Sequence, residues 1–375
     1  MGALLVYALT TNWSELRQAR ANPMLTLAYL GPVLVFVVFL LSGFHTDDTD
    51  HWLKQVRIKL PFLLLPVAFL LLRREITIRG HQLLHYVLAT VGLLSSIPVL
   101  YHYYTNAEEL LLAIGKGHYI PTPIDHIHYS IILAYSSLSM VLIYLDRTYQ
   151  QTRTEQVASL AVAAMLAAVI HILAVRSGLA ILYIGVGAIA LWYVVQRRTV
   201  AVGLVAVVCM TVLPLLAYKT IPSLQKKIDY MVYDFEQYKK GEGKNYSDSE
   251  RLMSYRIAYD LAKEEPLVGH GVGDLRQLMI ERHQALYGEK EKYIFPHNQY
   301  LYVLSGAGLL GFLFFFIGLL SPILFGHRGP FLVLIFIVML ASFMVENTLQ
   351  RAVSIAFFLL FMYWNLMLDP KRLAQ

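Results

Sequence analysis

One histidine stands where a proton-transfer group is useful, at the entrance to a long apolar segment. His297 lies within residues 295–300 (FPHNQY), directly before the apolar run 299–325. A neutral imidazole can accept a proton near physiological pH, and Pro296 restricts the backbone at this turn. His297 is therefore the leading candidate for a general base. The alternative is an interfacial histidine that makes a structural hydrogen bond.

Three arginines could bind phosphate, because the planar guanidinium group matches the spacing of phosphate oxygens. An unpaired positive charge at a membrane surface also costs free energy, so a partner is expected. Arg176 lies between two apolar runs with almost no intervening segment. Arg251 and Arg256 lie in a predicted helix, and a spacing of five residues rotates them by about 140°, so they need not share a face. The alternatives are a snorkelling anchor for Arg176 and solvated surface positions for the other two.

A polar cluster separates two further apolar runs. It contains Glu346, Asn347, Gln350 and Arg351. An internal pair of Glu346 with Arg351 would explain this cluster structurally, since a charge at a membrane boundary is stabilised by a partner. We treat these two residues, and Tyr300 beside His297, as secondary candidates for the site.

Two more histidines, His126 and His128, also precede an apolar run. Their i, i+2 spacing can ligate a metal on a strand or loop, but no cysteine and no HExxH-type pair accompanies them. We therefore predict no metal site and no cofactor. His128 is kept as a secondary candidate.

The elements that position these residues are membrane helices, since the chain is 57% hydrophobic and only 15% charged, against roughly 25% charged residues in soluble domains. A spanning helix needs about 20 apolar residues. The segments near this length are 25–44, 61–72, 82–104, 129–145, 157–175, 178–195, 199–218, 299–325, 330–345 and 352–368. The second is short and spans only if residues 52–56 extend it. We expect an all-α polytopic membrane protein with ten to twelve transmembrane helices.

The basic residues of the short connections indicate the topology. With ten spans both termini share a side, and that side carries 12 Lys and Arg residues against 6 on the opposite side. The twelve are Arg17, Arg20, Arg73, Arg74, Arg79, Arg147, Arg153, Arg197, Arg198, Arg328, Lys371 and Arg372. Positive charge in short loops favours the cytoplasm, so we predict cytoplasmic termini and an outward-facing segment 219–298, which in a bacterium would face the periplasm or the cell exterior.

This topology divides the chain into a transmembrane bundle (1–218), a periplasmic helical segment (219–298) and C-terminal spans (299–375). Within 219–298 we predict helices from Ile221 to Tyr238 and from Asp248 to Glu264, the second with a capping box in residues 247–250. A third runs from Asp274, as N-cap, to Leu286. The glycine-rich turn 269–273 permits positive φ and could hold a phosphate with its amides, although no strand precedes it.

The order of these motifs resembles the O-antigen ligase and polymerase superfamily. The resemblance rests on RSG at 176–178, SDSER at 247–251, EPLVGHGVG at 265–273, HNQYL at 297–301 and GAGLLG at 306–311. It covers about the C-terminal two thirds of the chain and is most specific from 251 to 311. Tyr255 stands where the family commonly has an aromatic residue, often tryptophan. The family usually has about twelve spans, where we count ten.

The resemblance implies an inverting, metal-independent glycosyltransferase of the membrane GT-C type. It implies that Arg176 and Arg251 hold the undecaprenyl pyrophosphate of a glycan donor and that His297 activates the acceptor hydroxyl. The secondary candidates are Arg256, His128, Tyr300, Glu346 and Arg351. The expected function is that of an O-antigen ligase, which transfers the glycan to a lipid A core sugar in the bacterial inner membrane, surrounded by membrane lipids.

Two alternatives stay open. An O-antigen polymerase uses the same donor with a second carrier-linked repeat as acceptor, and the candidate residues do not separate the two. A lipid-linked glycan flippase or transporter would also be polytopic, but transporters carry charged sites near the bilayer midplane and show internal repeats. Here the polar candidates gather on one side. A nucleic-acid partner is not expected, because the basic residues lie in short caps rather than on one exposed face.

Overall fold

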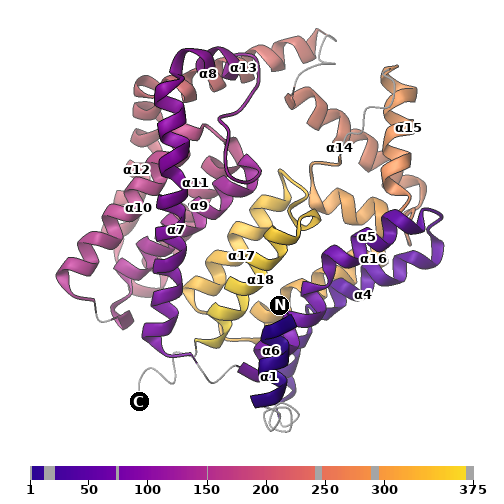
Figure 1. The fold of residues 1–375 in the computed structure, drawn as a ribbon, viewed down its shortest axis with the longest axis horizontal. Coiled ribbons are helices and arrows are strands. Elements are labelled where there is room, and N and C mark those ends of the chain that lie inside the picture. The colour runs from indigo at the N-terminus through magenta and orange to yellow at the C-terminus, as the bar shows by residue number, and fades with distance from the viewer. Residues whose placement is uncertain are drawn as a thin grey trace. The chain divides into compact units, whose positions relative to one another are not determined.

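The computed structural model describes residues 2–11, 22–72, 76–149, 151–240, 247–288 and 295–368. Within these ranges every regular element is a helix (Figure 1). The prediction of an all-α chain is therefore confirmed for the part of the chain that is described, and each predicted apolar segment lies on a helix.

In the described part of the chain, seven helices are long and apolar enough to cross a membrane. They are Thr49–Leu72, which joins α5 (Thr49–Lys59) to α6 (Pro61–Leu72), α7 (Ile78–Thr105), α9 (His126–Leu145), α10 (Arg153–Leu173), α11 (Arg176–Arg197), α12 (Val200–Thr220) and α16 (Gln299–Phe325). The pair Pro23–Leu30 (α3) and Val33–His45, which begins with α4 (Val33–Leu41), bends by 53° and qualifies only as a unit. The helices α17 (Pro330–Phe343) and α18 (Ala352–Met367) are apolar but shorter.

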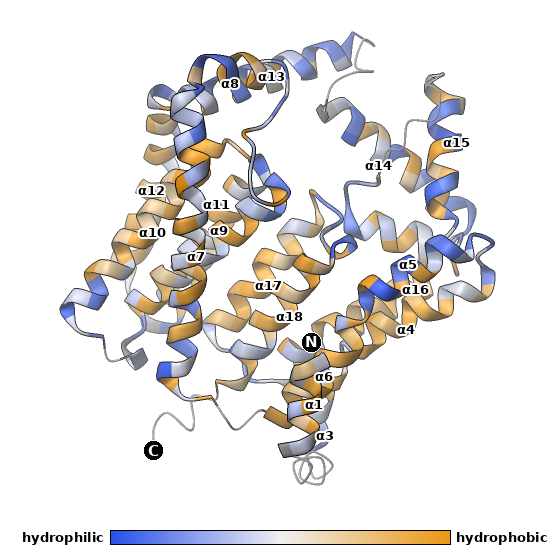
Figure 2. Ribbon diagram, viewed as in Figure 1, coloured by the Kyte–Doolittle hydropathy of each residue, from blue (hydrophilic) through white to orange (hydrophobic). Residues whose placement is uncertain are grey.

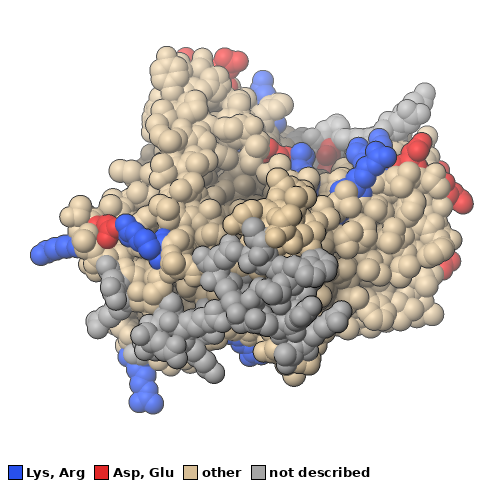
Figure 3. Space-filling model, turned by 60° about the horizontal axis from the view of Figure 1, so that its bottom comes forward, with Lys and Arg blue, Asp and Glu red and all other residues tan. Residues whose placement is uncertain are grey.

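The distribution of polarity agrees with a membrane protein. Figure 2 shows apolar residues along most of the length of these helices. In the face drawn in Figure 3, described Lys, Arg, Asp and Glu side chains are few.

The predicted extension of 61–72 by the preceding residues is confirmed, because α5 and α6 together form one candidate span of 24 residues.

The chain forms two compact units. Unit 1 comprises Met1–Ile76, Ser249–Leu332 and Phe343–Arg372, and unit 2 comprises Thr77–Asp248, Val333–Ser342 and Leu373–Gln375. The helix α17 contributes residues to both units. The division into 1–218, 219–298 and 299–375 remains a prediction, since it concerns topology in the membrane.

In unit 1, α16 packs along α3 and α4, and α18 packs against α6, which also contacts α1 (Gly2–Thr11). The hydroxyl of Tyr363 on α18 donates to the carbonyl oxygen of Tyr29 at 2.8 Å. The Tyr363 ring stacks on Tyr29 and on Phe69, with centroids 5.8 and 5.2 Å away. Tyr363 is fully buried, so this bond satisfies its hydroxyl inside the core and ties α18 to α3 and α6.

The helix α16 is interrupted at Gly308, which has φ 64° and ψ −173°. The glycine-rich turn supplies backbone partners at this break. The amides of His270 and Gly271 donate to Ser305 and Gly306 at 3.0 and 2.9 Å, and the amides of Leu309 and Leu310 donate to Pro266 and Leu267 at 2.8 and 3.1 Å. Unpaired backbone groups are costly at membrane depth, so these four bonds stabilise the break.

This arrangement corrects the suggestion that the turn 269–273 cradles a phosphate. Two of its amides, those of His270 and Gly271, are engaged by α16. The glycines have a packing role instead, because a Cβ at Gly269 would lie 2.5 Å from the amide nitrogen of Gly308.

The prediction that Asp274 caps the third helix is wrong. The helix α15 (Leu275–Tyr287) begins where expected, but the Asp274 side chain makes no capping hydrogen bond. Its carboxylate accepts instead from the amides of Asp47 and Asp48, at 2.9 and 2.7 Å. Since bonds from N–H groups to a carboxylate are strong, Asp274 holds the start of α15 against the residues that precede α5.

The helix α14 (Ser247–Glu264) begins one residue before the predicted position. The side chain of Ser247, on which the predicted capping box depends, lies outside the described part of the chain. In unit 2, α13 (Pro222–Lys239) confirms the predicted helix Ile221 to Tyr238.

Unit 2 is built around α9, which packs against α7, α10 and α11. Glycines allow the close approach of α11. A Cβ at Gly178 would lie 2.5 Å from the Cβ of Ser130, and one at Gly185 would lie 2.2 Å from Leu138. Small residues at such crossings let helix backbones approach each other in membranes. The short helix α8 (Ala107–Ile114) lies against α13.

The substitution Gly308→Ala should destabilise the protein strongly. Its Cβ would lie 2.3 Å from the carbonyl carbon of Leu267, at a positive φ that alanine disfavours. We expect a loss of about 3 kcal/mol or more, measured by thermal unfolding in detergent. The comparison variant is Gly288→Ala, at φ 70° and ψ 12° with no atom within 4 Å. It reports the cost of alanine in the left-handed helical conformation without a clash, about 1 kcal/mol. Equal losses in the two variants would contradict the packing of the turn against α16.

Candidate active site

His297 lies at a bend, two residues before α16 begins. Asn298 caps this helix, since its Oδ1 accepts from the amide of Leu301 at 3.0 Å. The Asn298 amide group also donates to the carbonyl oxygen of Met344 at 3.3 Å. Because the cap sets the direction in which the chain enters the helix, it holds His297 one residue outside the first turn.

Two residues of α14 bind the backbone of His297. Its amide donates to Ser254 Oγ at 3.4 Å, and the Tyr255 hydroxyl lies 2.9 Å from its carbonyl oxygen and 3.1 Å from that of Met344. One hydroxyl carries one proton, so the two carbonyls share it. Tyr255 thereby links α14 to both segments that meet at His297.

The side chain of His297 pairs with Glu346. Nδ1 lies 3.1 Å from Oε2, and the side chains are 30% and 12% exposed. The other Glu346 oxygen accepts from the amide of Asn347 at 3.0 Å. Burial raises the pKa of this carboxyl, but the hydrogen bond and charge of His297, the Asn347 amide and the charge of Arg251 outweigh it. The pKa of Glu346 is therefore below its ordinary value.

This pairing decides which imidazole nitrogen can take a proton. An ionised carboxylate only accepts hydrogen bonds, so Nδ1 must carry the hydrogen and Nε2 keeps its lone pair. Within the described chain no hydrogen bond involves Nε2. A carboxylate behind an imidazole also stabilises the imidazolium that forms on protonation. In this arrangement the carboxylate orients the imidazole, and Nε2 of the neutral ring can accept a proton.

The two arginines of α14 have different surroundings, as their spacing predicts. Arg251 is half-buried and lies close enough to Glu346 to lower the pKa of its carboxyl. Arg256 is exposed. Arg251 therefore belongs to the group around His297, whereas Arg256 lies on another side of the helix.

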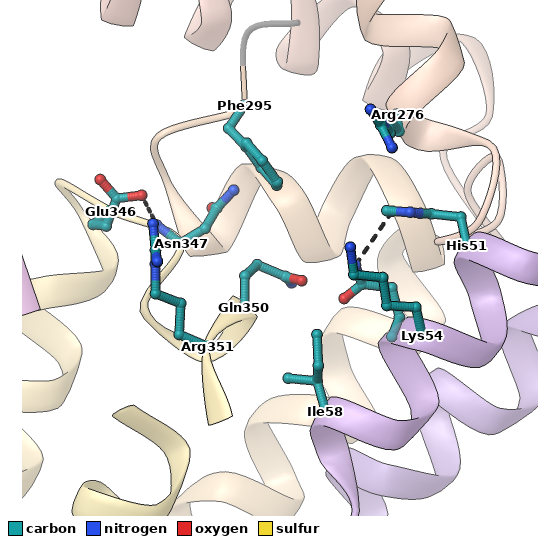
Figure 4. A pocket seen from close by; sticks show the side chains of 10 residues that line it. His51, Lys54, Ile58, Arg276, Phe295, Glu346, Asn347, Gln350 and Arg351 are labelled. Carbon is teal, nitrogen blue, oxygen red and sulfur yellow. Dashed lines mark hydrogen bonds between the residues drawn. The ribbon is translucent and has the colours of Figure 1, made fainter. Parts of the chain in front are cut away.

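The other candidates of unit 1 fall into two environments. The ring of Tyr300 stacks on Phe316, with centroids 5.5 Å apart, and meets Phe343 edge-on at 5.8 Å. Its environment is thus an aromatic cluster. Arg351 is exposed, and Figure 4 shows its side chain extending toward Glu346.

A cavity of about 360 Å³ lies beside the His297–Glu346 pair, within unit 1. Its lining comes from α5, α15 and the segments around 295 and 346–351 (Figure 4). The residues are His51, Lys54, Gln55, Ile58, Arg276, Phe295, Glu346, Asn347, Gln350 and Arg351.

Sequence reasoning missed the part of this cavity that α5 and α15 provide. One face of α5 carries His51, Lys54 and Gln55, whose i, i+3 and i+4 spacing places them together on a helix. This polar face directly before an apolar span could have indicated a site. Arg276 has no comparable local signal, because the other residues of the cavity are far from it in sequence.

Arg176 and His128 belong to unit 2. Arg176 is half-buried in the first turn of α11 and lies two residues after Ala174, whose left-handed conformation (φ 52°) lets α11 follow α10 without a longer connection. Nδ1 of His128 lies 3.0 Å from Asp125 Oδ1, and Asp125 also caps α9. The ring of His126 stacks on Tyr119 with centroids 3.7 Å apart.

The substitution Glu346→Gln should remove a pH-dependent part of the stability. Because the pKa of Glu346 is lowered by folding, its carboxylate stabilises the protein above the ordinary carboxyl pKa of about 4.3. This contribution is lost as pH falls through the folded pKa. We expect the variant to be less stable by about 1 kcal/mol at pH 7 and the gap to close below about pH 4.

Thermal unfolding across this pH range checks the expectation. Glu265→Gln, which changes an exposed carboxyl of the same unit, is the control and should leave the curve unchanged. A gap for Glu346→Gln that stays constant from pH 7 to pH 3.5 would contradict a carboxylate held ionised by its partners.

Comparison with known proteins places part of the chain in a family. Residues 160–316 match the family model described as O-antigen ligase. The matched segment contains Arg176, Arg251 and His297 and ends before Glu346. No curated protein matches the chain. The predicted resemblance is thereby confirmed.

Proposed function

We propose that this chain, of which residues 160–316 match the family model described as O-antigen ligase, is an O-antigen ligase. In this proposal a glycan moves from undecaprenyl pyrophosphate to a hydroxyl of a lipid A core sugar, at the periplasmic face of the bacterial inner membrane. The observation that supports this chemistry most directly is the His297–Glu346 pair, with Nδ1 3.1 Å from Oε2.

The proposed topology has ten spans in a GT-C-like arrangement. It combines the seven long apolar helices with the bent pair α3 and α4 and with the shorter helices α17 and α18. The asymmetry of basic residues supports cytoplasmic termini and a periplasmic segment 219–298. The bundle 1–218 then precedes this segment and the spans of 299–375 follow it, which puts His297 at the periplasmic end of α16.

In the proposed reaction the acceptor hydroxyl gives its proton to Nε2 of His297. Its oxygen attacks the anomeric carbon of the donor sugar, and the bond from that carbon to the pyrophosphate oxygen breaks. The electron pair leaves with undecaprenyl pyrophosphate, and attack from the opposite side inverts the anomeric configuration. Glu346 holds the neutral imidazole in the tautomer that carries hydrogen on Nδ1, and it stabilises the imidazolium that forms in the step.

The leaving pyrophosphate carries the charge that cations must offset. Arg251 is the candidate in unit 1, since it already acts on the carboxyl of Glu346. The proposal also keeps Arg176 as a donor ligand, on the strength of the family resemblance and of its place in the first turn of α11, where backbone N–H groups add positive potential. These guanidinium groups supply the electrostatic stabilisation, so no divalent metal is required for the step.

Reconstitution with separate substrates tests the function. Purified protein is supplied with a carrier-linked oligosaccharide and lipid A core, with a chelator present. Glycan on the core supports the ligase. A ladder of longer glycans on the carrier alone would identify a polymerase, and no transfer with either acceptor would contradict the proposal.

The substitution His297→Ala should abolish transfer while leaving donor affinity nearly intact, because the imidazole acts on the acceptor. Loss of a general base lowers turnover by about 10²–10⁴-fold. Single-turnover transfer and donor binding are measured in parallel. Turnover within a few-fold of the wild type would remove His297 from the mechanism.

The substitution Arg251→Ala should weaken donor binding and also slow transfer, because the guanidinium acts on the pyrophosphate before and during its departure. We expect turnover to fall by about 10²-fold. Arg256→Ala, on another side of the same helix, is the matched control and should behave like the wild type. Equal behaviour of the two variants would count against Arg251 as a donor ligand.

A further inference from the structure

The cavity beside Glu346 has the size and lining of a sugar site. Its volume of about 360 Å³ lies within the range of about 300–1,000 Å³ typical of small-molecule pockets. None of its lining residues is Arg251 or Arg176, the residues proposed to bind the donor pyrophosphate. The cavity is thus a separate part of unit 1.

Two buried amide side chains of this cavity have polar atoms without a hydrogen-bond partner in the described chain. Asn347 is 2% exposed, and neither its Oδ1 nor its Nδ2 is hydrogen-bonded by the described chain. Gln55 is 3% exposed and its Oε1 likewise has no partner there, while its Nε2 lies 3.2 Å from His51. Buried polar groups are normally satisfied. Amides that both donate and accept match the hydroxyls of a sugar.

The remaining lining residues indicate an anionic ligand. Lys54, Arg276 and Arg351 come from three different segments and all line the cavity, and the lining includes one carboxylate, that of Glu346 (Figure 4). Guanidinium and ammonium groups bind phosphate oxygens strongly. Three cationic side chains beside one carboxylate therefore suit a ligand that carries negative charge.

Phe295 completes the lining with an apolar surface. Figure 4 shows its ring directed into the cavity and the Asn347 amide turned toward it. A flat aromatic face beside polar amides suits a sugar ring, which has one apolar face and a polar edge.

The cavity also adjoins the proposed base, because Glu346 lines it and holds His297 Nδ1 at 3.1 Å. We propose that this cavity binds a phosphate-bearing sugar of the acceptor and thereby sets which hydroxyl reaches His297. The proposal rests on the proposed function for the identity of the acceptor. In this site Lys54 and Arg276 bind the phosphate, and Asn347 makes hydrogen bonds to the sugar hydroxyls.

Binding is measured first without turnover, in the His297→Ala background, so that it does not depend on transfer. The probe is the phosphorylated core oligosaccharide released from lipid A, compared with the same oligosaccharide after phosphatase treatment. Lys54→Gln should weaken binding of the phosphorylated probe by about tenfold and leave the dephosphorylated probe unaffected. Arg57→Gln, an exposed residue of the same helix outside the cavity, should change neither.

The substitution Asn347→Ala separates ligand recognition from folding. It should weaken binding of both probes by a similar factor while the unfolding temperature of the free protein stays the same or rises, because the amide has no protein partner to lose. A lowered unfolding temperature with unchanged binding would assign Asn347 to folding and overturn its role here.

Transfer assays then identify the source of the phosphate. With Lys54→Gln in the active protein, the KM for phosphorylated core should rise about tenfold and the KM for the donor should not change. A rise in the donor KM instead would place an acidic sugar of the donor glycan in the cavity and overturn the acceptor assignment. If Lys54→Gln and Arg57→Gln bind the phosphorylated probe equally well, the cavity is not the binding site. If the protein with His297 intact binds the probe but transfers no glycan, only the proposed function is overturned.

Discussion

The constraint on which unit 1 depends is the pairing of backbone groups at the break of α16. A helix that leaves its regular path at Gly308 must find other partners for its amides and carbonyls, and residues 266–271 provide them through four backbone bonds. This requirement brings the segment between α14 and α15 onto α16. The two helices that flank the segment are thereby held close to the residues that precede α16.

The consequence of that docking is a histidine held by several elements. Ser254 and Tyr255 of α14 bind the backbone of His297, while Glu346 binds its ring from the segment that follows α17. Positions defined by several contacts are more precise than positions on a free loop, and transfer chemistry depends on precise placement. The carboxylate adds a chemical effect to the positional one, since it selects the imidazole nitrogen that keeps its lone pair.

The cavity depends on a second docking contact of the same unit. Asp274 binds the amides of Asp47 and Asp48, so the start of α15 lies beside the start of α5. Arg276 of α15 and Lys54 of α5 line one cavity in consequence. Asp274, which the sequence suggested as a local helix cap, therefore connects α15 to the segment before α5. Its carboxylate accepts the amides of Asp47 and Asp48 and does not cap α15.

The helices and the membrane class follow from the sequence alone, because apolar runs and helix-ending residues act over a few turns of chain. The motifs around Arg176, Arg251 and His297 likewise identify the family. The partners of the site were not predictable. Glu346 lies 49 residues from His297, and Asp274 lies 227 residues from Asp47.

At such separations nothing local distinguishes one carboxylate from another, and several acids were equally plausible partners. Which one binds is decided by the packing of distant helices and by the need to satisfy every buried polar group. The sequence alone determined where the helices run and which residues have the right chemistry. The tertiary structure decided that Glu346 orients His297, that the glycine-rich turn closes the break in α16, and that cations from α5 and α15 share a cavity.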